Sequence, residues 1–445
     1  MRSESRAARR SASAASRSAL ASAGLAASPD LSAPWRAEDD RPLVATVLAW
    51  GVGVALLSRF VLSENLLNAV IDYSSDGGSV LEKIHVGTYL GVGLLALALL
   101  TTRIALLPAE VRILRQFGWL VAVIAALTAV VVLAGNSVSA GFLVDTYVSS
   151  ALACALMFVL PPDSRRRIGD ALLIFMALSS LVAIAEKAVG LRLLPYPYVE
   201  NGFRPTGLTS HPLVVGLFNA GSIAFVMATR WPGWAKAAAM LLLVMAAFAA
   251  GARTGALLAA AVALVSALTM PLSNPDPAQR LKTRGLILLG LVCLIPIALP
   301  AMAQLGLLER FITDGYVDDS ANARVEIYRI FGLVDWRDIL LGADPLWIKK
   351  LAFEKLGFEF IESPVVMFVF QFGALGAAAL FCTILLSLWR LAAGSDWRAA
   401  LGVVAFLLCA LSNNTLSSKN QAIVMMVVLC LAYRRDDAPG RGWPA

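Results

Sequence analysis

The sequence predicts an all-α protein that crosses a membrane many times. Hydrophobic residues make up 59% of its 445 residues and charged residues only 15%, and the mean hydropathy is +0.75. Soluble domains contain about 25% charged residues, whereas several apolar runs here reach the roughly 20 residues that a spanning helix needs. The shorter alternating segments of a membrane β-barrel are not seen.

Applying the length criterion along the chain gives about twelve spans. Their approximate limits are 42–62, 86–107, 117–135, 139–161, 168–190, 210–229, 233–250, 253–271, 285–304, 363–389, 397–412 and 419–433. One large polar insertion, 305–362, interrupts this pattern late in the chain and is rich in charged residues. A membrane protein with a single such insertion is expected to use it for recognition or chemistry.

The two ends of the chain are predicted to be tails flanking a transmembrane domain over 42–433. Residues 1–41 are rich in Ser, Ala and Arg and lack an apolar core long enough for a signal peptide. We expect a disordered cytoplasmic tail there; a transit peptide and a start codon assigned too far upstream are the alternatives. A second cytoplasmic tail is expected over 434–445.

The net charge of +7 could suggest nucleic-acid binding, but the positions of the basic residues favour a topological explanation. They cluster in alternate connectors, as the positive-inside rule requires. These residues are Arg103, Arg112, Arg115, Arg165, Arg166, Arg167, Arg230, Lys236, Arg280, Lys282, Arg284, Arg390 and Arg398. Both termini are therefore expected in the cytoplasm, and the insertion on the outer side. No nucleic-acid partner is expected.

Several kinds of chemistry lack their sequence signatures. All five cysteines lie in apolar segments without CxxC spacing, which favours a role as small core residues over metal or redox work. There is no P-loop, no Gly-x-Ser-x-Gly, no HExxH, and no Asp-x-Asp on the outer side. We therefore expect no cofactor and no metal, so the energy for any reaction would come from an activated substrate.

Three arginines lie on the predicted outer side, where topology gives no reason for them: Arg204, Arg253 and Arg324. Arg253 stands between two apolar helices with almost no loop. A cation at such a boundary is costly without an anionic partner. A single arginine could instead extend its guanidinium from a helix end into water, but three on one side favour an anion-binding site.

A histidine follows the first of these arginines at the start of a span. Arg204-Pro-Thr-Gly207 precedes His211-Pro212. Pro212 suits a first helical turn, and Ser210 or His211 occupies the cap position. The sequence favours hydrogen bonding of His211 to the backbone and leaves contact with a ligand as the second possibility.

Within the insertion, residues 321–331 are predicted to form an amphipathic helix capped by Ser320. Its apolar face carries residues at i, i+3 spacing: Val325, Tyr328 and Phe331. Arg324 shares a face with Tyr328 at i+4. Pairing with Asp318 or Asp319 is the structural explanation of Arg324, and ligand binding is the functional one.

The end of the insertion is a helix start. Ser363 as N-cap and Pro364 at the first helical position predict it. Glu362 would lie beside the positive end of that helix dipole, which is structurally favourable. A carboxylate there could also act as a base, since it faces both the outer loop and the membrane boundary.

Taken in order, these motifs resemble those of the O-antigen ligase and polymerase superfamily (the Wzy and WaaL type), bacterial membrane enzymes acting on undecaprenyl-diphosphate-linked sugars. The likeness extends over roughly 195–390. It rests on an ordered set of short motifs: Arg204-Pro-Thr-Gly207, His211-Pro212, Gly251-Ala-Arg253-Thr-Gly255, Arg324, Leu341-Gly342, Glu362 and Phe372-Gly373-Ala-Leu-Gly376. It implies a GT-C-like fold with a large periplasmic loop containing short helices.

Ligases of this group typically have a His, often followed by Asn, near the end of the loop, as their candidate base. Glu362-Ser363 takes that place here, which favours the polymerase branch, especially exopolysaccharide polymerases. The resemblance then implies an inverting, metal-independent glycosyltransferase in the bacterial inner membrane. An O-antigen ligase, with a lipid A core or a protein as acceptor, is the alternative. A transporter or flippase ranks lower, with Glu186 and Lys187 as its clearest intramembrane charges.

The resemblance also implies roles for individual residues. Arg204, Arg253 and Arg324 would hold the diphosphate, and Glu362 would be the base. The candidate substrate contacts are His211 and Tyr328. The implied partners are undecaprenyl-diphosphate-linked oligosaccharides, membrane lipids, a flippase and a chain-length regulator.

Overall fold

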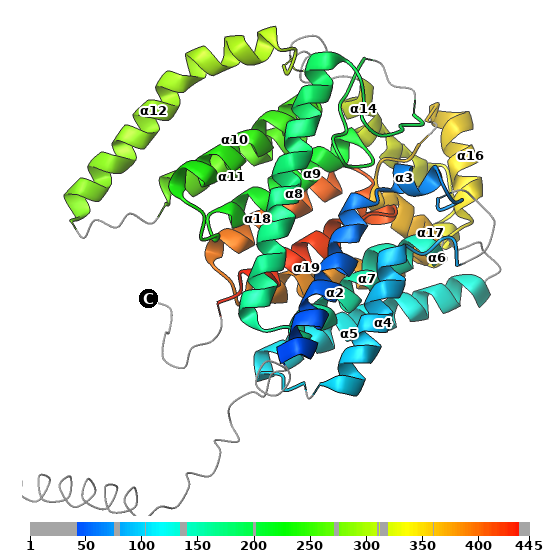
Figure 1. Ribbon diagram of the computed structural model, residues 1–445. Helices are drawn as coiled ribbons and strands as arrows, with labels where there is room; N and C mark the ends of the chain where they lie inside the picture. The colour runs from blue at the N-terminus through cyan, green and yellow to red at the C-terminus, as the bar shows by residue number, and fades with distance from the viewer. Residues whose placement is uncertain are drawn as a thin grey trace, which may run out of the picture.

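The computed structural model describes residues 42–74, 81–102, 104–133, 140–198, 202–270, 276–308, 311, 319–358 and 360–435. Every regular element within these ranges is a helix (Figure 1). The tail predicted over 1–41, and all but the first two residues of the one predicted over 434–445, lie outside the described residues.

The helices follow one another along the chain with short connectors outside the insertion. In order they are α2 (Pro42–Val61), α3 (Glu64–Asn68), α4 (Val86–Thr101), α5 (Pro108–Leu133), α6 (Ala140–Leu143), the π-helix η1 (Val144–Val148), α7 (Ser149–Val159), α8 (Pro162–Val189), α9 (Pro212–Val226), α10 (Gly233–Ala249), α11 (Arg253–Leu268), α12 (Pro277–Gln304), α14 (Asp319–Glu326), the 3-10 helix η2 (Ile327–Gly332), α15 (Trp336–Leu341), α16 (Pro345–Leu356), α17 (Pro364–Ala392), α18 (Trp397–Leu411), the 3-10 helix η3 (Thr415–Ser417) and α19 (Ala422–Ala432).

Four of these helices are long and apolar enough to cross a membrane, namely α2, α5, α8 and α17. Seven further apolar segments are shorter, at 10–17 residues: α4, η1 with α7, α9, α10, α11, α18 and α19. The remaining predicted span, 285–304, lies inside α12, which stands to one side of the bundle (Figure 1). The described chain is therefore all-helical, with the apolar helices of a membrane protein.

Several helices begin before the spans that hydrophobicity alone predicts. α5 begins at Pro108 and α8 at Pro162, because proline fits the first helical turn without losing a hydrogen bond. Basic residues predicted to lie in connectors therefore lie in helices. Arg165 is one, and it is buried in an ion pair with Glu110 at 2.9 Å. Arg165 thus links α8 to α5 in addition to any role in topology.

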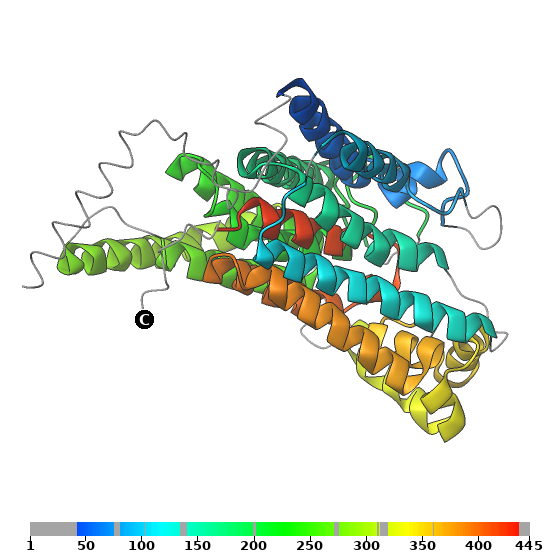
Figure 2. The same ribbon diagram turned by 90° about the horizontal axis from the view of Figure 1, so that it is seen from below.

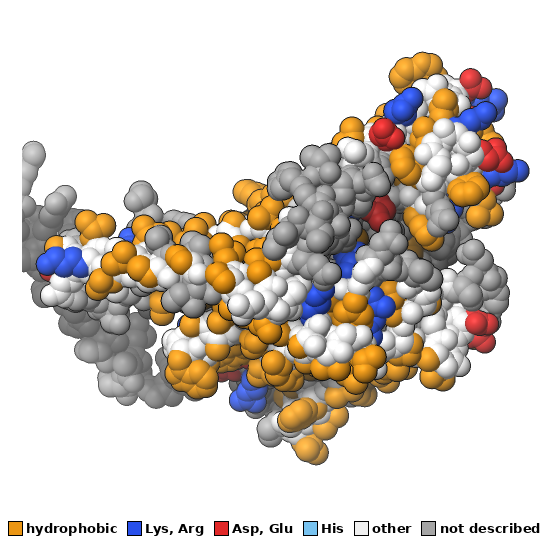
Figure 3. Space-filling model, turned by 90° about the horizontal axis from the view of Figure 1, so that it is seen from above, with side chains coloured by type: hydrophobic (Ala, Val, Ile, Leu, Met, Phe, Trp, Pro, Cys, Tyr) orange, Lys and Arg blue, Asp and Glu red, His pale blue; other side chains and the backbone are white. Residues whose placement is uncertain are grey.

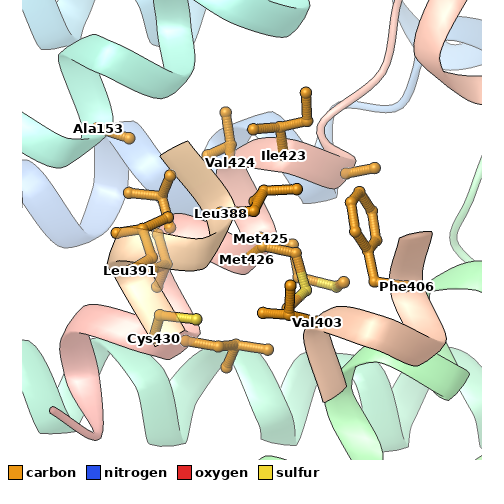
Figure 4. Packing of buried hydrophobic residues seen from close by; sticks show 14 of the residues in the cluster. Ala153, Leu388, Leu391, Val403, Phe406, Ile423, Val424, Met425, Met426 and Cys430 are labelled. Atoms are coloured by element: carbon orange, nitrogen blue, oxygen red, sulfur yellow. The ribbon is translucent and has the colours of Figure 1, made fainter. Parts of the chain in front are cut away.

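The core is centred on α19, whose 11 residues are all buried. Figure 4 shows Met425 and Met426 of this helix between residues of its neighbours, among them Leu388 of α17 and Phe406 of α18. A helix of this length is about 16 Å long, roughly half the thickness of a bilayer core. α19 is therefore an interior helix surrounded by protein.

The irregular segment before α19 has its polar groups satisfied by neighbours. The Tyr147 hydroxyl donates to the Leu416 carbonyl at 2.5 Å, and the Thr146 hydroxyl to the Ser418 carbonyl at 2.9 Å. The side-chain oxygen of Asn420 accepts from the Ala422 amide at 2.9 Å. Non-helical backbone is tolerated at membrane depth only when protein or water satisfies it in this way.

The described part of the insertion packs on the first half of α17, which runs beside α5 (Figure 2). It has a small apolar core of its own, in which Ile330 and Ile348 pack against Phe370 of α17. The described part of the insertion is thus a small packed unit and not a string of solvated helices.

The amphipathic helix predicted over 321–331 differs from the one found. α14 begins at Asp319, so Ser320 lies inside it and the predicted cap is wrong. Val325 is 73% exposed and Tyr328 45%, while Ile327 and Ile330 are buried. The change to a 3-10 helix at Ile327 rotates the buried face away from the one predicted by uniform α-helical spacing.

Candidate functional site

The sequence-predicted site residues lie in the insertion, in the loop between α8 and α9, and at the starts of α11 and α17. In Figure 1 the insertion helix α14 and the C-terminal end of α8 both lie at the upper end of the bundle. The insertion begins beside the loop of Arg204. A Cβ on Gly306 would lie 3.4 Å from the Lys187 side chain, and the Lys187 ammonium donates to the Phe203 carbonyl at 3.3 Å. The loop after α8 and the insertion therefore share this end.

Glu186 fixes the loop that carries Arg204. Its Oε2 accepts from the amides of Thr206 and Gly207 at 2.9 and 2.8 Å, and its Oε1 accepts from the Leu193 amide at 2.8 Å. The side chain is buried, so these three donors replace the water that a carboxylate otherwise needs. Glu186 therefore anchors the loop, and this role weakens the case for it as a carrier's exchanging charge.

Hydrogen bonds place Arg204 against the turn that leads to Arg253. The Arg204 Nε donates to the Ala250 carbonyl at 3.1 Å, and the Arg204 carbonyl accepts from the Arg192 Nε at 3.0 Å. Ala250 is the C-cap of α10, and Arg253 is the first residue of α11 three positions later. The two arginines singled out in the sequence are thus brought to one turn.

Close helix packing holds this turn in place. A Cβ on Gly255 would lie 2.7 Å from the Gly216 Cα, so α9 and α11 touch through their backbones. Arg253 is the first residue of α11, and its N-cap residue, Ala252, offers no side-chain acceptor. The positive end of the α11 dipole and the charge of Arg253 are therefore at the same helix terminus. This arrangement favours the binding of an anion there.

His211 caps α9, as expected. Its Nδ1 accepts from the Leu213 amide at 3.2 Å, so in the neutral ring Nε2 carries the proton. Burial, together with the charges of Arg204 and Arg192, lowers the pKa of His211 to about 4. The ring of Tyr198 lies 5.9 Å away, centroid to centroid. His211 is thus a neutral hydrogen-bond donor among aromatic rings, which suits contact with a sugar.

Arg324 pairs with Glu362; the pairing with Asp318 or Asp319 considered from the sequence stays a prediction, because the side chain of Asp319 is not described. The Arg324 Nη2 lies 3.0 Å from the Glu362 Oε2, with side chains 31% and 41% exposed. Asp318 lies outside the described residues. Two residues selected separately from the sequence, as anion binder and as base, therefore form one partly exposed ion pair.

Two more residues complete this second group. The Tyr328 hydroxyl and the Ser363 Oγ are 3.2 Å apart, and the Ser363 Oγ accepts from the Val366 amide at 3.4 Å. Ser363 is thus the N-cap of α17, with Pro364 in the first turn, as predicted. The helix start holds Glu362 next to Arg324 and Tyr328.

The predicted residues thus form two groups at the same end of the bundle, one around Arg204 and Arg253 and one around Arg324 and Glu362. Figure 3 shows Lys and Arg side chains gathered near the middle of this face. Guanidinium groups can bind a polyanion, and the partly exposed carboxylate of Glu362 can accept a proton from a neutral hydroxyl.

Sequence reasoning missed a buried polar network between α2, α4 and η1. Asp145, in the π-helical turn, accepts from the Tyr73 hydroxyl at 2.8 Å and the Thr88 hydroxyl at 3.0 Å. It also accepts from the His85 amide at 3.0 Å, and Arg59 pairs with it at 3.5 Å. Lone charges inside predicted spans are the signal that could have located this network.

Among the described residues, no group of three or more His, Cys, Asp and Glu side chains is placed to hold a metal ion. No family model, curated protein or solved structure matches the chain. Its functional interpretation therefore comes from the two groups of residues described above and their chemistry.

Proposed function

We propose that the chain is an inverting, metal-independent glycosyltransferase of a bacterial inner membrane, which joins one undecaprenyl-diphosphate-linked oligosaccharide to another. The observation that carries the proposal is the Arg324–Glu362 ion pair, 3.0 Å long and partly exposed. It lies at the end of the bundle that also carries Arg204 and Arg253. A diphosphate leaving group needs fixed cations, and an acceptor hydroxyl needs a base; this end offers both.

The reaction is a single displacement. The acceptor hydroxyl oxygen attacks the anomeric carbon of the donor sugar, and the bond from that carbon to the diphosphate oxygen breaks. Glu362 takes the hydroxyl proton, and the diphosphate leaves with the bonding electrons. Arg204 and Arg253 bind the diphosphate, while Arg324 stabilises the charge that grows as it departs. Attack opposite the leaving group inverts the anomeric configuration.

His211 and Tyr328 would position the sugars in this scheme. The Nε2 proton of His211 and the hydroxyl of Tyr328 are hydrogen-bond groups next to the two charged groups. Neutral donors and aromatic rings suit the hydroxyls and apolar faces of a sugar ring.

The proposal includes about twelve crossings, cytoplasmic termini and a periplasmic insertion. It is supported by the positive-inside pattern and by the position of the described ends of the chain, away from the insertion in Figure 1. The test replaces the natural cysteines by serine and adds Lys350→Cys or Lys282→Cys. A membrane-impermeant maleimide applied to spheroplasts is expected to label only the first. Labelling of Lys282→Cys alone would overturn this topology.

Polymerase and ligase activities are distinguished by what accumulates when the protein is removed. Loss of a polymerase leaves single repeats on the lipid carrier, whereas loss of a ligase leaves long polymer on it. The experiment is therefore to extract lipid-linked glycans from a deletion strain and separate them by size. We expect single repeats. Long carrier-linked polymer would overturn the polymerase in favour of the ligase, with lipid A core or protein as acceptor.

A further inference from the structure

A cavity of about 410 Å³ opens at the opposite end of the bundle from the candidate site. It is formed by the first turns of α5, the end of α17 and the residue two positions after α19. Three of its lining residues are arginines, one from each of these segments: Arg112, Arg390 and Arg434. The other lining residues are small or apolar, among them Ile113 and Ala393.

The cavity holds positive charge without a carboxylate among its lining residues. Two acidic residues next to lining residues in the chain, Glu110 and Asp396, are already paired, whereas Asp436 and Asp437, which follow Arg435, lie outside the described residues. Glu110 binds Arg165 at 2.9 Å, and Asp396 binds Arg398 at 3.1 Å and Arg435 at 2.6 Å. Within the described part of the chain, none of the three cavity arginines forms an ion pair.

Arg434 gives a second, independent indication of a ligand. Its Nη1 is buried and has no hydrogen-bond partner among the described residues. Its guanidinium packs directly over Gly394, where any Cβ would clash with it. A buried N–H of a charged group that has no acceptor costs free energy. A ligand in the cavity that accepts a hydrogen bond from this atom would remove that cost.

Helix-end electrostatics explains only part of this arrangement. Arg390 lies in the last turn of α17, where a cation interacts favourably with the helix dipole, and its Nη1 reaches the Arg112 carbonyl at 3.5 Å. The dipole gives no reason for the buried Nη1 of Arg434 or for three guanidinium groups around one cavity. Arg112 is exposed and Arg390 and Arg434 are half-buried, and an anion with several acceptor oxygens would offset the charge of all three.

We propose that this cavity binds a phosphate-bearing anion, and its position favours the phosphodiester of an acidic lipid head group. The cavity lies where two candidate spans end, which is the depth of the head groups, and basic pockets between membrane helices bind such lipids. Ile113 and Ala393 offer apolar contact to the glycerol and the first acyl carbons. The cavity lies at the C-terminal end of α17, and Glu362 precedes the first turn of the same helix, so the two sites are at opposite ends of α17.

The test uses the full chain in detergent micelles, incubated with phosphatidylglycerol or with zwitterionic phosphatidylcholine, and counts retained lipid by native mass spectrometry. We expect the wild-type protein to retain phosphatidylglycerol selectively. Each substitution Arg112→Gln, Arg390→Gln or Arg434→Gln is expected to weaken retention about fivefold, and the triple variant about a hundredfold.

A matched control carries the same loss of charge on a different helix. Arg280→Gln, Lys282→Gln and Arg284→Gln together remove three exposed cations from α12, which does not line the cavity. This variant is expected to retain phosphatidylglycerol like the wild type. Equal retention by the cavity variant and the wild type, or equal losses in the cavity and α12 variants, would overturn the proposal.

A second pair of variants tests the proposal independently, in case the triple variant does not fold. Ala393 is exposed at the cavity, so Ala393→Glu adds an internal anion and Ala393→Lys a cation of similar length. Only the first is expected to lose the lipid; loss in both or in neither would contradict the proposal. Addition of inorganic phosphate identifies the source of the ligand. Retention in its presence assigns the cavity to a lipid head group, and displacement assigns it to a soluble phosphate compound.

Discussion

The Arg324 Nη2 donates to the Glu362 Oε2 at 3.0 Å, although 38 residues separate the two in the chain. The contact joins the first helix of the described insertion to the start of α17. With the side chains 31% and 41% exposed, such a pair contributes at most about 1 kcal/mol to stability. Its loss is therefore too small to unfold the protein, and a large loss of activity on breaking it would report on chemistry.

Glu362→Gln tests the base directly. The amide keeps the shape and leaves the Ser363 cap intact, but it accepts a proton far less readily, so we expect polymer formation to fall about a hundredfold or more. The measurement is polymer formed from lipid-linked repeats by purified protein, beside its thermal unfolding temperature. Polymer of wild-type yield and length would reduce Glu362 to a helix-start residue.

The exchange variant Arg324→Glu with Glu362→Arg is the control for that prediction. It re-forms an ion pair of opposite polarity, so its stability is expected to stay near that of the wild type. Activity is expected to remain lost, because the carboxylate then lies on α14 and away from its original position. Recovery of activity together with stability would show that the pair is only structural.

Neutralising Arg204 or Arg253 is expected to weaken the binding of the diphosphate. Arg253→Gln and Arg204→Gln should each lower activity about 10²–10³-fold, the usual effect of removing one group that stabilises a developing negative charge. Arg230→Gln is the control, since Arg230 is 74% exposed in a 3.8 Å pair with Asp163. Equal activities of the Arg253 and Arg230 variants would contradict the anion site.

Glu186→Gln is expected to release the loop that carries Arg204. The new NH₂ group would face amides that now donate to Oε1 and Oε2, and each unsatisfied buried donor costs about 1–3 kcal/mol. We expect a lower unfolding temperature together with loss of activity. Glu354→Gln, which breaks only an exposed 3.8 Å pair with Lys350, should change stability by about 0.5 kcal/mol or less. An unfolding temperature of the Glu186 variant equal to that of the wild type would show that Glu186 does not anchor the loop.

Gly373→Ala is expected to detach the insertion from α17. Gly373 has a φ of 74°, and a Cβ there would lie 2.2 Å from the Leu340 carbonyl oxygen. The strain alone costs about 1–3 kcal/mol, and the Ala343 amide, which donates to the Phe370 carbonyl at 2.6 Å, would lose its position.

The matched control for Gly373→Ala is Gly118→Ala. Gly118 lies inside α5, and a Cβ added there would meet open space. Alanine should therefore stabilise that helix by about 0.5–1 kcal/mol. Limited proteolysis in the insertion and thermal unfolding measure both variants. Resistance to protease in the Gly373 variant equal to that of the wild type would rule out this docking contact.

The two histidines, one buried and one half-buried, predict how stability depends on pH. The folded-state pKa of His211 is lowered to about 4, and so is that of His85, against about 6.5 in the unfolded chain. Between these values the unfolded chain binds more protons, so stability is complete above about pH 6.5 and falls as the pH drops towards 4.

His211→Asn preserves a capping side chain but does not titrate. We expect a shallower loss of stability between about pH 6.5 and 4, with the remaining slope due to His85 and other groups. Thermal unfolding followed across this range provides the measurement. An unchanged slope would mean that His211 has the same pKa in both states.

Local signals predicted much of the fold. Apolar runs located the helices, and Ser363-Pro364 and His211-Pro212 located two helix starts, because caps and first-turn prolines act within a few residues. The same local signals selected Arg204 and Arg253, which the structure brings to one turn.

Long-range pairings were beyond those signals. Nothing near Arg324 in the chain indicates that its partner is Glu362, because neighbouring aspartates offer a closer choice. Nothing around Gly373 in its continuous apolar run indicates a non-helical residue, since the cause is a carbonyl from the insertion. Asp145 was overlooked for a related reason: its donors come from three separate segments.

The complete burial of α19 has a consequence for how the protein is made. A segment of 11 residues is shorter than the roughly 20 that a bilayer accepts as an independent span. Because this helix has no surface left for lipid, it can reach its place only after α7, α8 and α9 have assembled around the vacant site. α19 would then complete the bundle, and deletion of this helix would leave the helices that precede it unable to pack.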